Sequence, residues 1–332
     1  MGFWMLLIYL VITFSILFIL LCISPHGSGP IAATSRVFFV HIPNWSYSLT
    51  IKLLGVEGTA RFKYYAMYIF TEPNPFFQMV YLALSIGGYT IYYIYGFPYI
   101  PNPYVQEFHI YIGSFLYFIA LLTFISASIV SPCIIDKQNL KYHLELFPYD
   151  NILYKPSDCS ACKIQKPARS KHCSICKFCI GKQDHHCIWI NQCVGYSNYK
   201  YFLAFILSHS LICFYAGQVG IMILIYIIQN DKLLSVVFID KLGNEVKGSW
   251  IVIFQYMLQR LPSFVFVIIL CLIMGLTLGG FFVYHLFMAG QNVTSNERIK
   301  MMKLEDNGKN RVNVYNLGFW KNINEVLDAV EF

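Results

Sequence analysis

The chain has 332 residues, of which 57% are hydrophobic and only 12% are charged. Soluble domains carry about 25% charged residues, so this composition excludes an ordinary soluble protein and indicates an integral membrane protein. The net charge of +7 is weak support for nucleic acid binding. The basic residues concentrate in particular loops between apolar segments, where they report orientation and contact with anionic lipid.

Five apolar segments are long enough to cross the hydrocarbon layer, which takes about 20 residues. In chain order they are Phe3–Ile23, Phe76–Tyr95, Phe108–Val130, Tyr201–Ile228 and Pro262–Met288. The predicted fold class is therefore an all-α polytopic membrane protein with about five transmembrane helices. No positive residue precedes the first segment, so we expect an anchor rather than a cleaved signal peptide.

Lysine and arginine counts favour one orientation, because cytosolic loops carry an excess of these residues. The segments 24–75 and 131–200 and the tail after residue 288 are basic, whereas 96–107 has no such residue and 229–261 has nearly as many acids as bases. We therefore expect a luminal N-terminus, with the cysteine-rich segment and the C-terminal tail in the cytosol.

Seven of the eleven cysteines lie between Cys159 and Cys193. This segment contains Cys-X-X-Cys pairs joined by histidines and further cysteines, a spacing typical of tetrahedral zinc sites with thiolate and imidazole ligands. An iron–sulfur cluster is the weaker alternative, because the histidines disfavour it. We interpret the other four cysteines as small apolar packing residues; they are Cys22, Cys133, Cys213 and Cys271.

Inside this cluster the run Asp184-His185-His186-Cys187 places a thiol beside imidazoles and a carboxylate. A free thiol is only a few per cent thiolate at neutral pH. A neighbouring imidazole can accept its proton, and a carboxylate can fix the orientation of that imidazole. The run therefore points to acyl transfer, with Cys187 as nucleophile.

From Cys159 to Phe202 the sequence resembles the cysteine-rich domain of the DHHC family of protein S-acyltransferases (palmitoyltransferases), most closely the DHHC-type-four subgroup. The shared pattern comprises paired cysteines, Pro-X-Arg, His-Cys, Asp-His-His-Cys-X-Trp and Asn-X-Cys-X-Gly. The resemblance implies two structural zinc ions, each with three cysteines and one histidine, and leaves Cys187 free. It also implies that His185 is the proton shuttle for Cys187 and that Asp184 orients this imidazole. The implied ligand sets are Cys159, Cys162, His172 and Cys179 for one ion, and Cys173, Cys176, His186 and Cys193 for the other.

The resemblance also implies the reaction and its participants. A long-chain acyl group, such as palmitoyl, passes from acyl-CoA to Cys187 and then to cysteines of cytosol-facing or membrane-associated proteins. The lipid bilayer is an expected partner and nucleic acid is not; the implied location is the membrane of the endoplasmic reticulum or Golgi. The residues expected at the acyl-CoA site are Trp189, Lys166, Arg169 and Lys182.

These features divide the chain into four parts. Residues 1–131 hold three spans, and 132–200 form the cytosolic zinc domain with short β-hairpin knuckles. Residues 201–288 hold two further spans, and 289–332 form the cytosolic tail. In the tail, residues 294–297 resemble the family's Thr-Thr-X-Glu element, with a turn and a capping residue as the plainer interpretation.

The tail also contains Asn322, which belongs to a motif that resembles the family's C-terminal aromatic and asparagine element; we expect it to be structural. Three departures from the family pattern remove neither a zinc ligand nor the nucleophile. Ser131-Pro132-Cys133 stands near the family's Asp-Pro-Gly, Ile188 replaces a frequent proline, and Gln192 replaces a second asparagine.

Three other functions are compatible with a multi-span chain that carries a zinc domain. The first is a catalytically silent family member that acts as a scaffold or regulator. The second is a membrane-tethered zinc module that binds proteins or nucleic acid, and the third is a transporter. A transporter fits poorly, because the spans hold almost no ionisable residues beyond His109, His209 and His285. We expect these three histidines to be hydrogen-bonded or interfacial.

Overall fold

The computed structural model describes residues 42–239, 243–306 and 313–329. The chain divides into two compact units, residues 1–70 and residues 71–332. The predicted anchor Phe3–Ile23 lies outside the described residues.

Helix α3, Ile42–Thr71, makes up the described part of the first unit and lies in the basic segment 24–75, where no helix was predicted. Gly55 has a φ of 69° and breaks this helix into two parts, a conformation that glycine adopts without steric penalty. Exposed apolar side chains occur along it, among them Leu53, Val56 and Phe62. Because the apolar residues do not gather on one face, the sequence offers no helical periodicity to recognise.

The second unit is built on four long helices: α4 (Phe76–Tyr95), α5 (Phe108–Ile129), α7 (Tyr199–Asn230) and α9 (Pro262–Gly290). Each begins and ends within two residues of a predicted span. Three of the helices, α5, α7 and α9, are long and apolar enough to cross a membrane. Helix α4 is not among these three, because glycine, threonine, glutamine and several tyrosines dilute its apolar character.

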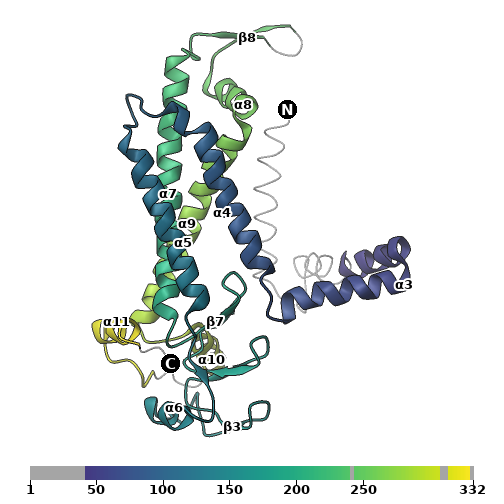
Figure 1. The fold of residues 1–332 in the computed structure, drawn as a ribbon, viewed down its shortest axis with the longest axis vertical. Coiled ribbons are helices and arrows are strands. Elements are labelled where there is room, and N and C mark those ends of the chain that lie inside the picture. Colours follow the sequence, from purple (N-terminus) through teal and green to yellow (C-terminus); the bar gives the residue numbers. More distant parts are fainter. Residues whose placement is uncertain (1–41, 240–242, 307–312, 330–332) are drawn as a thin grey trace. The chain divides into compact units, whose positions relative to one another are not determined.

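Helix α7 packs along both α5 and α9, and α4 packs against α9, as Figure 1 shows. Two glycines allow the close approach of α7 to α9. A Cβ atom at Gly217 would lie 2.6 Å from Leu272, and one at Gly220 would lie 2.5 Å from Ile268. Small residues at helix contacts serve the same purpose in membrane bundles generally.

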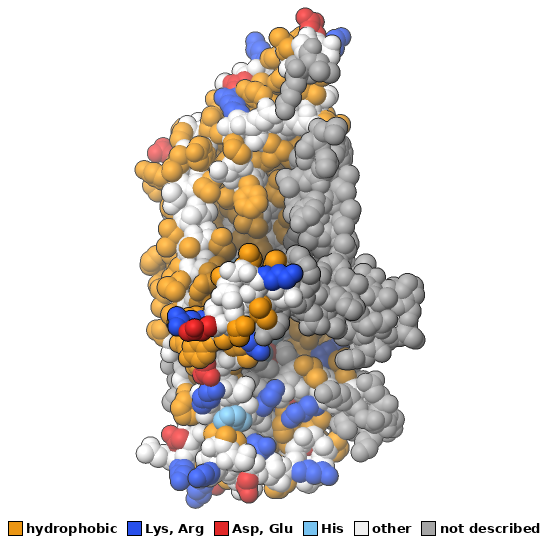
Figure 2. Space-filling model, turned by 90° about the vertical axis from the view of Figure 1, so that its right-hand side faces the viewer, with side chains coloured by type: hydrophobic (Ala, Val, Ile, Leu, Met, Phe, Trp, Pro, Cys, Tyr) orange, Lys and Arg blue, Asp and Glu red, His pale blue; other side chains and the backbone are white. Residues whose placement is uncertain are grey.

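Hydrophobic side chains cover the face of the bundle in Figure 2, whereas lysine and arginine side chains gather at the end that carries the cysteine-rich domain. Apolar residues of α9 such as Leu276 and Val283 are more than 60% exposed. An apolar exterior of this kind matches a helix bundle surrounded by lipid.

Short elements connect the long helices at the end of the bundle away from the cysteine-rich domain. The 3₁₀ helix η2 (Phe97–Tyr99) lies between α4 and α5. Between α7 and α9, where the sequence indicated only a loop, the chain forms an antiparallel hairpin of β8 (Val237–Ile239) and β9 (Glu245–Lys247) and the helix α8 (Trp250–Arg260).

The cysteine-rich domain contains three short antiparallel hairpins, as the predicted knuckles required. They pair β2 with β3, β4 with β5, and β6 with β7, and β1 adds to the free side of β5. The bounds are β1 Ile134–Ile135, β2 Asp158–Cys159, β3 Ile164–Gln165, β4 Lys171–Cys173, β5 Phe178–Ile180, β6 His185–Cys187 and β7 Gln192–Val194, with α6 at Leu140–Leu146.

The tail forms α10 (Ser295–Asp306) and α11 (Phe319–Leu327), and α11 packs against α9 and α7. Asn322 anchors α11, because its side-chain nitrogen donates to the carbonyl oxygen of Gly290 at 2.7 Å and its side-chain oxygen accepts from the amide of Leu317. This buried side chain has the structural place that the sequence motif predicted.

Candidate active site and metal centres

Two Cys-X-X-Cys turns have the same local geometry. In the first, the amide of Cys162 donates to the sulfur of Cys159 at 3.4 Å, and in the second the amide of Cys176 donates to the sulfur of Cys173 at 3.4 Å. The residue that follows each pair, Lys163 or Lys177, has a positive φ. Such turns direct both sulfurs of a pair to one point, as a tetrahedral metal site requires.

The structure brings the eight implied ligands together as two sets of four. In each set the candidate ligand atoms all lie within 4.8 Å of one another. The β4–β5 hairpin contributes to both sets, so the two sites are tied to one another. The sets are Cys159, Cys162, His172 and Cys179, and Cys173, Cys176, His186 and Cys193.

The donor chemistry of both sets suits zinc. Three sulfurs and one imidazole nitrogen form a full tetrahedral shell, which is typical of a structural zinc ion and leaves no position for substrate. Cys162 Sγ lies 3.2 Å from His172 Nδ1, and Cys176 Sγ lies 3.3 Å from His186 Nδ1, so Nδ1 is the ring nitrogen that faces the sulfurs in each set.

Cys187 is the one cysteine of the segment 159–193 that belongs to neither set. It lies on β6, where successive side chains point to opposite sides of the strand. Because His186 faces the metal site, His185 and Cys187 lie together on the other side. This alternation explains how two adjacent histidines have different surroundings.

Asp184, His185 and Cys187 form a hydrogen-bonded series. His185 Nδ1 lies 2.7 Å from Asp184 Oδ2, and the ring also bonds the thiol of Cys187. Burial disfavours a charge on the imidazole, but the bonds to Asp184 and Cys187 outweigh it and raise the pKa of His185 to about 9. Burial raises the pKa of Cys187, yet its bond to His185 brings that pKa below the ordinary value.

The second oxygen of Asp184 is bound at the start of α10. The amide of Ser295 donates to Asp184 Oδ1 at 2.7 Å. Thr294 Oγ1 accepts from the amide of Glu297 at 3.2 Å, and Glu297 Oε2 accepts from the amide of Thr294 at 2.9 Å. This reciprocal arrangement is a capping box, and it presents the positive end of the helix to Asp184.

The capping box gives a structural role to Thr294 and Glu297 of the Thr-Thr-X-Glu element. It also explains why serine can replace the second threonine of that element, at Ser295. Ser295 bonds Asp184 through its backbone amide, which is the same for serine and threonine. Burial raises the pKa of Asp184, but the bonds from His185 and Ser295 outweigh it and hold that pKa below its ordinary value. The carboxylate is therefore present as an anion at neutral pH.

Arg169 is fully buried beside Glu297, with 2.7 Å between Nε and Oε1 and 2.7 Å between Nη2 and Oε2. Its guanidinium also donates to both oxygens of Asn292 and lies over the rings of Phe147 and Tyr315. Four of the five N–H groups of the guanidinium donate to these oxygens. Arg169 therefore faces the interior of the protein rather than its surface.

The four residues expected at the acyl-CoA site therefore fall into two groups. Arg169 and Lys182 are buried and bonded to carboxylates of the tail, Arg169 to Glu297 and Lys182 to Glu325. Trp189 is 41% exposed, and Lys166 is partly exposed. Only this second pair is accessible to a CoA molecule in the structure.

Apolar side chains of the bundle surround Cys187. It packs in one cluster with Phe124 of α5, Phe202 of α7 and Ala289 of α9. The ring of His185 lies edge-on to that of Phe202, with 5.2 Å between centroids. Cys187 thus lies where the cysteine-rich domain meets the helices.

The sequence did not indicate that one histidine of the spans, His285, lies close to His185. His285 of α9 is buried with its ring centroid 6.0 Å from that of His185, and its Nδ1 bonds the hydroxyl of Tyr199 at 2.9 Å. The prediction that the three histidines in the spans are hydrogen-bonded is confirmed, since His109 bonds Tyr215 and His209 bonds Tyr81.

Gln192 and Cys133, at two positions that depart from the family pattern, hold the cysteine-rich domain to the end of α5 and to the segment that follows it. Gln192 Nε2 donates to the carbonyl oxygens of Ala127 and Val130, at 2.5 and 3.0 Å, where α5 ends. The carbonyl oxygen of Cys133 accepts from the amide of Gly181 at 2.9 Å. The segment after α5 is therefore held by backbone and amide bonds without the Asp-Pro-Gly sequence.

Residues 153–302 match the model of the DHHC palmitoyltransferase family. The chain is 25% identical over 287 residues to the palmitoyltransferase ZDHHC4 of Bos taurus, covering 85% of this chain and 80% of that protein. It is 26% identical to the ZDHHC4 of Mus musculus, covering 78% of this chain and 79% of that one. The palmitoyltransferase swf1 of Schizosaccharomyces pombe is 31% identical over 180 residues, 53% of this chain and 49% of the relative. The segment 153–302 therefore carries the domain of the DHHC palmitoyltransferase family.

Proposed function

We propose that this chain is a protein S-palmitoyltransferase that moves a long-chain acyl group from acyl-CoA to cysteines of cytosol-facing proteins through a thioester on Cys187. One observation carries the proposal. Cys187 lies outside both four-ligand sets, bonds His185, which in turn bonds Asp184, and packs against apolar residues of the spans.

The first half-reaction loads the enzyme. The thiolate of Cys187 attacks the carbonyl carbon of the acyl-CoA thioester, and the bond from that carbon to the CoA sulfur breaks. The CoA thiolate leaves and takes the proton that His185 received from Cys187. Asp184 holds the Nδ1 proton of His185 throughout, so that Nε2 faces the reacting sulfurs.

The second half-reaction transfers the acyl group to the protein substrate. A substrate cysteine gives its proton to His185 and attacks the acyl–Cys187 thioester, and Cys187 leaves as a thiolate. One thioester replaces another in each step, so the reaction needs no nucleotide hydrolysis.

The two sets of cysteines and histidines would hold structural zinc, which stabilises the fold of the domain. A four-ligand site has no open position, so the metal is not assigned a part in bond making. The role of the ligands is to fix β6, and with it His185 and Cys187, against the bundle.

The apolar surroundings of Cys187 suit an acyl chain. Burial of roughly fourteen methylenes, at about 0.8 kcal/mol each, is worth on the order of 10 kcal/mol. Lys166 and Trp189, the two accessible candidates, are proposed to contact the CoA portion. The proposed location is the endoplasmic reticulum or Golgi membrane, with five spans, a luminal N-terminus, and the zinc domain and tail in the cytosol.

A labelling experiment tests this function. Purified protein incubated with radiolabelled palmitoyl-CoA should take up label that neutral hydroxylamine removes, because hydroxylamine cleaves thioesters. The Cys187→Ser variant should take up none, whereas Cys271→Ser, a change in the span α9, should label like wild type. Label that persists in Cys187→Ser contradicts the proposal.

A further inference from the structure

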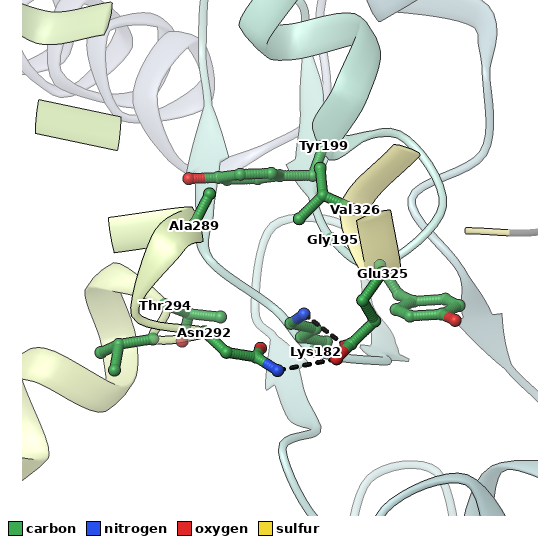
Figure 3. Close-up of a pocket in the computed structure, with 10 residues that line it drawn as sticks. Lys182, Gly195, Tyr199, Ala289, Asn292, Thr294, Glu325 and Val326 are labelled. Carbon is green, nitrogen blue, oxygen red and sulfur yellow. Dashed lines mark hydrogen bonds and ion pairs between the residues drawn. The ribbon is translucent and has the colours of Figure 1, made fainter. Parts of the chain in front are cut away.

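Two buried ion pairs lie beside the loop that precedes β6, and one of their four partners comes from the C-terminal helix α11. Lys182 Nζ lies 2.7 Å from Glu325 Oε1, with 10% and 19% of these side chains exposed. Arg169 and Glu297 form the other pair. Asn292 joins the two, because its nitrogen donates to Glu325 Oε2 at 2.7 Å and its oxygen accepts from Arg169 at 2.8 Å. Figure 3 shows Lys182 and Asn292 converging on Glu325.

These contacts close a circuit around Asp184. In one direction, Glu325 binds Lys182, which lies two residues before Asp184 in the chain. In the other direction, Glu325 binds Asn292, Asn292 binds Arg169, and Arg169 binds Glu297. Glu297 belongs to the capping box of α10, and the amide of Ser295 at the start of that helix donates to Asp184 Oδ1. One route from α11 thus reaches Asp184 along two residues of backbone, and the other reaches it through a hydrogen bond to the carboxylate that orients the imidazole.

The circuit is held as a unit by its charges. Two cations and two anions balance within it, and a buried charge that loses its partner is strongly unfavourable. A small pocket of about 20 Å³ lies beside the circuit, lined by Lys182, Tyr199, Thr294 and Val326 among others. That volume has room for about one water molecule.

Helix α11 presents Glu325 from a fixed position. Asn322, three residues earlier, is buried and bonds the carbonyl oxygen of Gly290 at the end of α9. Val326, the next residue after Glu325, packs in the same apolar cluster as Cys187. The carboxylate is thus attached to a helix that is itself docked on the bundle.

We propose that Glu325 is a positioning residue for the acyl-transfer reaction. Through Lys182 and Asn292 it fixes the place of Asp184, and hence the orientation of His185 toward Cys187, without touching acyl-CoA. The same geometry assigns Lys182 to this positioning role rather than to CoA binding. The inference rests on the proposed function of Cys187.

The test separates the rate of acylation from acyl-CoA binding. Glu325→Gln keeps the shape of the side chain and removes its charge. We expect the rate constant for acylation of Cys187 at saturating palmitoyl-CoA to fall about tenfold, with KM for palmitoyl-CoA within about twofold of wild type. Zinc content should stay the same. Asp328→Asn, which neutralises an exposed carboxylate at the end of the same helix, is the matched control and should react like wild type.

Lys182 supplies a second readout. Lys182→Met should slow acylation as Glu325→Gln does, and the double variant should be no slower than the slower single variant, since one interaction is removed in each case. A rise in KM without a change in the rate constant for Lys182→Met contradicts the inference and returns this lysine to CoA binding.

Two other results overturn the inference. One is Glu325→Gln that acylates as fast as Asp328→Asn. The other is loss of zinc in Glu325→Gln and also in Glu325→Asp, which keeps the charge and shortens the side chain, because the residue is then structural only. If Glu325→Gln alone loses zinc, Glu325→Asp carries the test and should be slow with zinc intact. An unlabelled wild-type protein contradicts the proposed function itself.

Discussion

The cysteine-rich segment and the helix bundle are stabilised by different forces. The strands of residues 159–193 are two or three residues long, and half of the residues in the two small apolar clusters around them are candidate zinc ligands. The bundle instead packs long helices through apolar side chains and close glycine contacts. Cys187, the proposed nucleophile, lies where the two meet, on β6 beside the candidate zinc ligand His186 and in an apolar cluster with residues of the long helices.

Removal of a zinc ligand should have the largest effect, because it should unfold the cysteine-rich segment and leave the helix bundle folded. His186→Ala should lose zinc and all acylation, since a structural zinc site is worth about 10–16 kcal/mol and a whole domain only about 5–15 kcal/mol. The helices should keep their far-ultraviolet circular dichroism. Cys213→Ser, in α7 and outside both sets, should retain its zinc. An unchanged zinc content in His186→Ala contradicts the ligand assignment.

Removal of the buried arginine should have the next largest effect on stability. Arg169→Met leaves the carboxylate of Glu297 buried without its cation, which should cost about 3–5 kcal/mol. Chemical denaturation of the purified variant measures this. The double variant with Glu297→Gln should recover part of the loss, and no recovery would show that the pair is not the cause.

A single backbone amide should matter more for rate than for stability. Ser295→Pro deletes the N–H that donates to Asp184 at the first position of α10, where proline is well tolerated. A hydrogen bond to a charged group is worth about 1.5–3 kcal/mol, so acylation should slow roughly 10- to 100-fold. Ser295→Thr keeps the amide and should react at the wild-type rate. Equal rates in the two variants contradict the capping-box account.

The smallest effect is expected on the exposed face of the zinc domain. Lys177 and Glu72 form an ion pair at 3.3 Å in which 57% and 43% of the side chains are exposed. Exposed pairs of this kind contribute about 0–1 kcal/mol, so Lys177→Ala should leave zinc content and unfolding nearly unchanged. A larger loss would mean that surface contacts, and not metal ligands, stabilise this domain.

Local signals in the sequence predicted the parts of the fold that depend on them. Apolar runs placed α4, α5, α7 and α9 within two residues, and the family resemblance gave the two ligand sets that the structure brings together. Long-range contacts left no such signal. Arg169 and Glu297 are 128 residues apart, and nothing in the spacing of either indicates the other.

The same limit applies to the cations of the zinc domain. Lys166, Arg169 and Lys182 look alike in the sequence as positive residues near the nucleophile, and only the position of the tail separates them. Glu297 and Glu325 bury two of the three, whereas Lys166 stays partly exposed. The number of lysine and arginine residues near Cys187 in the sequence therefore overestimates how many of them are available to CoA.

The most direct test of the central claim is a joint measurement of zinc and acyl content in Cys187→Ser. If the sulfur of residue 187 is free of metal and carries the acyl group, this variant should contain as much zinc as wild type and take up no label from palmitoyl-CoA. Loss of one zinc ion, or acylation at the wild-type level, would contradict the account.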